Sequence, residues 1–245
     1  MSLKEFYFKN LKKLIFVPII LIILSLFIIS TLYFKTGDFV YKDVTLQGGI
    51  SATLQTTKEF PNLEKQIESQ TNKDVIVRQS TQFGTDKQVG LIIESSDLTN
   101  DELKPILEKI TGIKITNENY SIEETGSTLG QAFYKQMISA ILIAFILMSI
   151  VVFIIYRALI PSIAIILAAF ADMVVTIAII DIIGLRISTA GIAAILLLMG
   201  YSIDTDVLLT TRMIKRREES VENRILKSIK TGLTMTFTTI AALTT

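Results

Sequence analysis

The stretch Ile192–Asp206 reads IAAILLLMGYSIDTD, an apolar run that ends in two carboxylates, Asp204 and Asp206. Three more apolar residues follow, so both acids lie inside a segment apolar enough to cross a membrane. A charge in such a segment costs from about 2.5 to more than roughly 10 kcal/mol, so acids there indicate a function such as a proton or ion pathway. The alternative is that both acids lie near the cytoplasmic end of the span and are hydrated there.

The composition of the chain is that of a membrane protein. Its 245 residues are 50% hydrophobic with a net charge of +1, and it has neither cysteine nor histidine. Disulfides, thiolate metal sites and a cysteine nucleophile are therefore excluded, and proton transfer near neutral pH must use carboxyl groups. We predict no metal or other cofactor. The small net charge gives no support to nucleic-acid binding.

Four segments have the length and apolar character of membrane spans. Lysines precede the first span and no small-residue cleavage site follows it, so we interpret it as an uncleaved anchor rather than a signal peptide. The positive-inside rule places residues 1–13, Arg157 and the basic cluster after Arg212 in the cytoplasm. The predicted transmembrane helices are 14–34, 137–156, 162–183 and 187–211.

Residues 35–131 have the patterning of a folded domain, which this topology places outside the cell. Its predicted elements follow the order β-α-β-β-α-β, typical of a ferredoxin-like α+β domain. Thr99 and Glu102 have the spacing of a capping box at the second helix. The predicted strands and helices are 50–55, 62–71, 75–77, 89–94, 99–110 and, as the last strand, 113–117.

The residues after the fourth span predict two further segments. Val221, Ile225 and Ile229 are four apart, which favours a cytoplasmic amphipathic helix over 216–230; the alternative is an ordinary charged loop. Residues 231–245 resume an apolar, threonine-rich pattern but are shorter than the ~20 residues that a crossing needs. We therefore predict the start of a fifth span.

The polar residues inside the spans are candidates for a proton relay. Asp172 lies about 16 Å beyond Pro161 by helix rise, close to the middle of the bilayer. Alanines and glycines accompany the acids in both spans, so we expect these two helices to pack together and keep Asp172 away from lipid. Asp204 and Asp206 are two residues apart and cannot face the same neighbour. The candidates are Asp172, Asp204, Asp206 and Arg212.

Three motifs together resemble the SecF subunits of the SecD/SecF protein-export complex, in the resistance-nodulation-division superfamily. They are Gln47-Gly48-Gly49 at the start of the external domain, Ala171-Asp172, and Gly200-Tyr201-Ser202-Ile203-Asp204-Thr205-Asp206 with Arg212. Bacterial members read Gly-Tyr-Ser-Ile-Asn-Asp-Thr at the third motif, so Asp204-Thr205-Asp206 is similar to the archaeal branch. The glycine pair is also a plausible hinge between the anchor and the external domain.

The resemblance implies a multi-pass subunit of a prokaryotic cell membrane that is not an enzyme. Its expected partners are a SecD-like subunit, a SecYEG-type translocon, the translocating polypeptide and the lipid bilayer. The proton-motive force would drive its work on the polypeptide, with Asp172 as the first candidate for the titrating group. The family's sixth span is absent from this sequence.

Three other functions fit parts of the pattern. An ABC-type mechanotransmitter permease also joins an early span, an external domain and three later spans, but it needs no buried acids. A small-molecule transporter of the same superfamily normally carries a second external domain and about twice the spans. An intramembrane aspartyl protease needs Tyr-Asp and Gly-x-Gly-Asp motifs, which are absent here.

Overall fold

The computed structural model describes residues 10–82, 84–85, 87–215 and 220–244. It divides into two compact units. The helical unit contains Met1–Val40, Ala140–Leu185 and Ile192–Thr245, and the second unit contains Tyr41–Ser139 and Arg186–Gly191. Most of the predicted cytoplasmic segment 1–13 lies outside the described residues, except for the short helix α2 (Leu11–Leu14) at its end.

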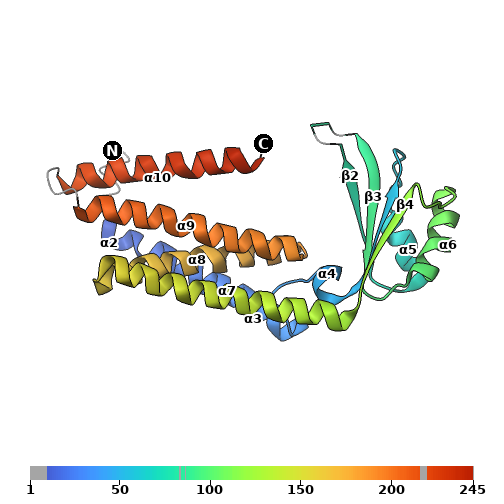
Figure 1. Cartoon of the computed structure of the whole chain (residues 1–245), viewed down its shortest axis with the longest axis horizontal. Helices are drawn as coiled ribbons and strands as arrows, with labels where there is room; N and C mark the ends of the chain where they lie inside the picture. The colour runs from blue at the N-terminus through green and yellow to red at the C-terminus, as the bar shows by residue number, and fades with distance from the viewer. Residues whose placement is uncertain (1–9, 83, 86, 216–219, 245) are drawn as a thin grey trace. The chain divides into compact units, whose positions relative to one another are not determined.

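Among the described residues there are four candidate membrane spans: Phe16–Thr36, Ser127–Tyr156, Leu159–Ile183 and Thr189–Ile214. They belong to helices α3 (Phe16–Thr36), α7 (Ser127–Tyr156), α8 (Leu159–Ile183) and α9 (Thr189–Lys215) (Figure 1). Many large apolar side chains, both aliphatic and aromatic, are exposed along these helices, as a surface in contact with lipid requires. The predicted polytopic helical fold is confirmed.

The interior of the helical unit brings α7, α8 and α9 together. One apolar cluster contains Val152 of α7, three residues of α8 and two of α9: Ile165, Ala169, Met173, Met199 and Ile203. The backbone of α8, however, lies alongside α3 over a greater length than alongside α9. At Gly200 of α9 an added Cβ would meet no atom within 4 Å. The two spans therefore pack on each other as predicted, with the small Ala169 in their contact, but Gly200 takes no part in it.

Helix α10 (Val221–Thr244) runs beside α9 (Figure 1). A single helix takes in residues from both the predicted amphipathic helix and the predicted start of a fifth span. Residues 216–219, where the amphipathic helix was expected to begin, lie outside the described residues. An added Cβ at Gly232 would meet Leu209 Cδ1 at 3.2 Å, so the two helices touch at this glycine.

The second unit is built on a four-stranded antiparallel sheet of order β2-β3-β1-β4. Its strands are β1 (Gly49–Gln55), β2 (Ile76–Thr81), β3 (Gln88–Ser95) and β4 (Tyr120–Thr125). Helices α5 (Leu63–Thr71) and α6 (Asn100–Thr111) cover one face, as Figure 1 shows. This is the predicted ferredoxin-like arrangement, with β3 inserted between β1 and β2.

Alternating apolar residues of β1 and β3 form the core of this domain with the inner faces of α5 and α6. The core side chains of Leu54, Ile67, Ile93 and Leu107 are fully buried. The Thr99 and Glu102 capping box begins α6 as predicted. These residues place the domain's hydrophobic stabilisation between the helices and one sheet face.

The predicted last strand is wrong. Residues 113–117 are not a strand; β4 starts at Tyr120, after a turn in which Asn119 Oδ1 accepts from the Thr116 amide at 2.8 Å. Ile115 was mistaken for a strand residue because it is buried, but its amide donates to Glu108 Oε1 at 2.8 Å instead of to a neighbouring strand. A buried isoleucine in a connecting segment has the same local pattern as one in a strand.

Asp181 and Arg186, at the end of α8 and just after it, also differ from expectation. In the sequence Asp181 lies near the outer end of its span and close to Arg186, which predicts a local pair with Arg186 or a solvated carboxylate. It is instead buried in α8, with 8% of its surface exposed, and Arg186 forms an ion pair with Asp74 of the second unit. The segment Arg186–Gly191 belongs to that unit.

Candidate functional site

Helix α8 presents Asp172 next to its packed face. Ala169 and Met173 lie three residues before and one after it, and both are buried against α7 and α9. Asp172 itself is exposed in the single chain. The expectation that α8 and α9 alone would shield this carboxylate is therefore wrong, because its side chain lies beside their contact and not within it.

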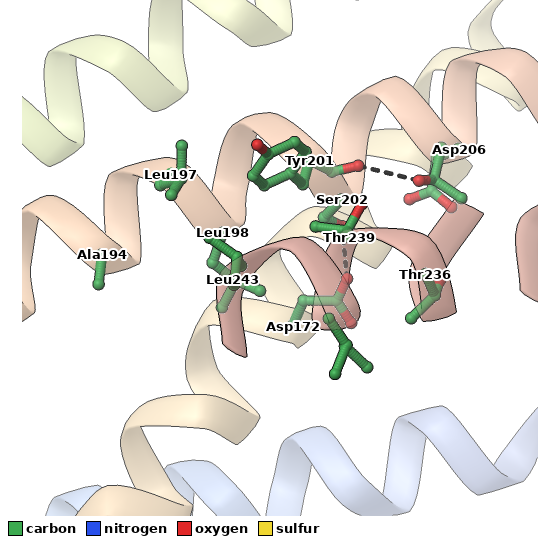
Figure 2. Close-up of a pocket in the computed structure, with 12 residues that line it drawn as sticks. Asp172, Ala194, Leu197, Leu198, Tyr201, Ser202, Asp206, Thr236, Thr239 and Leu243 are labelled. Carbon is green, nitrogen blue, oxygen red and sulfur yellow. Dashed lines mark hydrogen bonds between the residues drawn. The ribbon is translucent and has the colours of Figure 1, made fainter. Parts of the chain in front are cut away.

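Ser202 joins this carboxylate to α9. Its Oγ donates a hydrogen bond to Asp172 Oδ2 (Figure 2). The next residue, Ile203, is buried in the apolar cluster, which fixes the face of α9 that Ser202 occupies. The hydroxyl thus offers a hydrogen-bond donor to the acid from the neighbouring span.

A cavity of about 470 Å³ opens beside this pair, between α8, α9 and α10. Its lining is mostly apolar, with polar groups from all three helices: Asp172, Ser202, Thr205, Asp206, Thr236 and Thr239 (Figure 2). Asp206 is half-buried, and its Oδ2 has no hydrogen-bond donor among the described residues. Two carboxyl groups from successive spans therefore face one cavity.

A second cavity, of about 400 Å³, also reaches Asp172. It lies on the α3 side and is lined by Pro18 and Leu21 of α3, by α8 residues and by Leu198 of α9. Asp172 is the charged residue common to both cavities. A proton or ion that passes from one cavity to the other would meet this carboxylate.

Asp204 lies apart from these groups. It is exposed and lines neither cavity, whereas Asp206 lines the larger one. Residues two apart on a helix project about 200° from each other, so the predicted divergence of the two acids is what the structure has. The structure therefore brings together Asp172 and Asp206 and leaves Asp204 outside.

Arg212 is also outside the cavity. Its Nη1 donates to Thr231 Oγ1 of α10 at 2.5 Å, about 9 Å along α9 from Asp206 by helix rise. In this position Arg212 ties α9 to α10. Its role in a relay stays a prediction that no contact with the acids supports here.

The third motif contributes unequally to the site. Tyr201 lines the cavity, and its carbonyl accepts a hydrogen bond from Thr205 Oγ1 at 3.0 Å (Figure 2). Gly200 meets no neighbouring helix, as noted above. Of this motif, Tyr201, Ser202, Thr205 and Asp206 line the cavity.

Gln47, Gly48 and Gly49 lie in the second unit, at the end of the short helix α4 (Val44–Gln47). Gly48 has φ +94° and Gly49 has φ +130°. An added Cβ would lie 2.5 Å from Ser127 Cα at Gly48 and 2.6 Å from Ser96 Cα at Gly49. Glycine is required here by backbone conformation and by close chain crossing; a hinge at this pair stays a prediction.

The sequence analysis did not predict the role of the α10 threonines or the hydrogen bonds of Tyr156 to α9. Thr236 and Thr239 complete the cavity wall. Tyr156 Oη donates to the Val207 carbonyl at 2.6 Å and contacts Thr211 Oγ1 at 2.8 Å, which fixes α7 to α9 one residue beyond Asp206. The dense threonines of 231–239 were the one available signal, because hydroxyls in an apolar helix favour a polar neighbour.

Comparison with known proteins gives a consistent family. A family model described as "Protein export membrane protein SecD/SecF, C-terminal" matches residues 106–245. The protein-export membrane protein SecF of Pyrococcus furiosus is 37% identical over 236 residues, covering 95% of this chain and 77% of the relative. SecF of Methanocaldococcus jannaschii is 32% identical over 246 residues, covering 96% and 80%.

Solved structures show a similar fold. The crystal structure of SecDF from Thermus thermophilus, described as a translocon-associated membrane protein, matches with a TM-score of 0.66 and 19% identity. The match covers 100% of this chain but only 33% of that chain. A super-membrane-facing form of SecDF matches with a TM-score of 0.54 over 93% of this chain and 31% of the other.

Proposed function

Because this chain belongs to the SecD/SecF family of protein-export membrane proteins, we propose that it is a SecF-type subunit that uses the proton-motive force to assist polypeptide export. One observation carries the proton-driven part of this proposal. Asp172 and Asp206, from successive spans, face the same cavity inside the helical unit. The role in protein export is inferred from the family, and the use of protons is inferred from the two carboxyl groups that face the cavity.

The physical basis is the cost of charge in a span. An ionised carboxyl group in the membrane costs at least about 2.5 kcal/mol, and one charge that crosses 100 mV releases about 2.3 kcal/mol. Proton binding at these acids is therefore comparable in energy to the gradient that would drive it. Because both carboxyl groups face one cavity, the cavity offers a proton two acceptor groups on successive spans.

The hydrogen bond from Ser202 makes the contact between α8 and α9 depend on the charge of Asp172. Its hydroxyl donates to the carboxylate and would lose that acceptor when the facing oxygen is protonated. The contact spans α8 and α9, so a change of protonation changes the bonding between two helices. That is the local event we propose as the start of a conformational cycle.

The exposed side of Asp172 needs a cover in the membrane. We propose that a SecD-like subunit supplies it, since an exposed carboxylate in a span must face protein or water rather than lipid. The assembly would work beside a SecYEG-type translocon on the emerging polypeptide, with the ferredoxin-like domain outside the cell. In this role the chain is a transport subunit and not an enzyme.

The test uses export measured with and without an uncoupler, in cells that depend on this chain and its SecD-type partner. Asp172→Asn and Asp206→Asn should each lower gradient-dependent export at least about tenfold, because asparagine cannot exchange a proton. Asp204→Asn is the matched control, with the same change on the same helix outside the cavity, and should export normally. Wild-type export by Asp206→Asn and Asp172→Asn, at normal abundance in the membrane, would refute the proton-driven mechanism.

A further inference from the structure

The loop between α8 and α9 is folded into the ferredoxin-like unit. We call Arg186–Gly191, which comprises the end of this connection and the first three residues of α9, the coupling loop. Ile187 pairs with Lys42 in an isolated parallel bridge. Its amide donates to the Tyr41 carbonyl at 2.7 Å, and its carbonyl accepts from the Asp43 amide at 3.1 Å. The loop is thus bonded through its main chain to the segment that enters the domain.

Side chains strengthen the same attachment. Ile187 is 4% exposed, so its side chain is packed as well as its backbone. The Thr189 amide donates to Thr45 Oγ1 at 3.2 Å, and that hydroxyl donates to Asp43 Oδ1 at 2.6 Å. Asp43 Oδ1 also accepts from the Thr45 amide, as the N-cap of α4. The loop, the cap and the start of α4 therefore form one hydrogen-bonded set.

An ion pair extends the attachment to the sheet. Arg186 Nη2 lies 2.5 Å from Asp74 Oδ2, just before β2. Because the Asp74 side chain is 59% exposed, the charge attraction alone is weak. Its value is positional, since it holds the beginning of the loop to a second point of the domain, while Ile187 and Thr189 hold the middle.

We propose that the coupling loop is the mechanical link through which a change at the carboxyl cavity reaches the ferredoxin-like domain. This inference rests on the proposed function, because it presumes that the cavity acids change state during export. α8 carries Asp172, α9 carries Asp206, and the loop is the chain that joins them. A free loop would absorb a helix shift by rotating its backbone, whereas this loop is bonded to the domain at several points.

The proposed link requires one contact to persist throughout the conformational cycle. The pairing of Ile187 with residues 41–43 should persist through the cycle, so that the loop and the domain move as one piece. A covalent bond across that pairing would then be harmless. Loosening it would separate the chemistry in the spans from work on the polypeptide, although the cavity residues themselves would be unchanged.

The test exploits the absence of native cysteine. Lys42→Cys with Ile187→Cys places thiols at bridged positions. Neighbouring paired strands lie about 4.7–4.9 Å apart, within the range of Cα separations that a disulfide spans. The disulfide should form in membranes with a permeant oxidant, and gradient-dependent export should stay within about twofold of the reduced protein. Each single cysteine variant is the control for the oxidant. Loss of export on oxidation, with recovery on reduction, would show that the segments must separate and would overturn the inference.

The converse arm adds Arg186→Ala to the cysteine pair. In the reduced state this variant lacks both the ion pair and the packed isoleucine side chain, and its gradient-dependent export should fall at least about fivefold. Oxidation should restore export in the same molecules, which excludes a fault in folding or abundance. Wild-type export by the reduced variant, or no recovery when the disulfide forms, would overturn the proposed link.

Failure of the link and failure of the proposed function give different results. If the uncoupler does not change export by the wild type and Asp206→Asn exports normally, the proposed proton-driven function is wrong, and so is the link that rests on it. If those two controls respond as proposed but the reduced triple variant exports normally, only the link is wrong. The disulfide yield reports separately whether the loop is docked on residues 41–43 in the membrane.

Discussion

Gly48→Ala tests whether the glycine pair at the start of the domain is a crossing point that admits no side chain. Gly48 has φ +94° and ψ 160°, a region that is nearly exclusive to glycine and costs another residue of order 1–3 kcal/mol. The new Cβ would also lie 2.5 Å from Ser127 Cα, whereas ordinary contact starts at 3.4 Å, so backbone must move by most of an ångström. Such overpacking costs roughly 1–3 kcal/mol, which brings the total to about 2–6 kcal/mol.

Gly112→Ala is the matched control in the same domain. Gly112 has φ +66° and ends α6, but an added Cβ there would meet nothing within 4 Å. Its cost is the left-handed backbone alone, about 1–2 kcal/mol, and the effect of the substitution on the unfolded chain is the same in both variants. The two variants should therefore differ by about 1–4 kcal/mol in stability.

The assay is the temperature at which the domain becomes sensitive to protease in intact membranes. For a domain of about 100 residues each kcal/mol shifts the midpoint by about 4–8 °C, so Gly48→Ala should unfold about 4–30 °C below Gly112→Ala. Equal midpoints would refute the reasoning, because they would mean that Ser127 yields to a side chain at no cost. A hinge that needs only backbone freedom would predict that equality.

Burial raises the pKa of Glu94 above its ordinary value of 4.5, although the Arg78 guanidinium opposes this, so the folded domain loses stability as pH rises from 4.5 through the raised pKa. Glu94→Gln should reduce this loss of stability in thermal melts of the domain recorded at a series of pH values. A pH dependence of the melting temperature equal to that of the wild type would contradict the prediction. Thr99→Ala removes the hydroxyl half of the α6 capping box and should lower domain stability by about 1 kcal/mol in the same melt, whereas no change would mean that the cap is replaced by water. Tyr156→Phe removes the hydrogen bond to the Val207 carbonyl and should lower the unfolding temperature of the helical unit by the equivalent of about 1 kcal/mol without altering its membrane insertion; greater stability would show that the hydroxyl is not satisfied there.

Much of the fold follows from patterns that the sequence displays directly. The membrane spans can be predicted because a run of about 20 apolar residues has few alternatives to a membrane helix. Strand β1 and helices α5 and α6 can be predicted because the spacing of their apolar residues matches the face that is buried. The last strand was misplaced because Ile115 is buried without being in a sheet. Local periodicity reports burial, whereas strand pairing depends on partners far away in the chain.

The site shows the same boundary between local and distant information. That Asp204 and Asp206 diverge follows from helix geometry alone. That Asp206 rather than Asp204 faces Asp172 depends on the rotation of α9, which Ile203 sets by packing in the apolar cluster. Arg186 illustrates the limit most clearly, since it forms an ion pair with Asp74, more than a hundred residues earlier in the chain, and no local pattern in the sequence could indicate that pairing.

Proton movement through the reconstituted protein tests the central claim most directly. The chain and its SecD-type partner would be placed in vesicles with a membrane potential and a pH-sensitive dye inside, during translocation of a polypeptide. Wild type and Asp204→Asn should show proton flux that depends on the potential, and Asp172→Asn and Asp206→Asn should abolish it. Undiminished flux in Asp172→Asn and Asp206→Asn would contradict the account, because the shared cavity would then have no part in carrying protons.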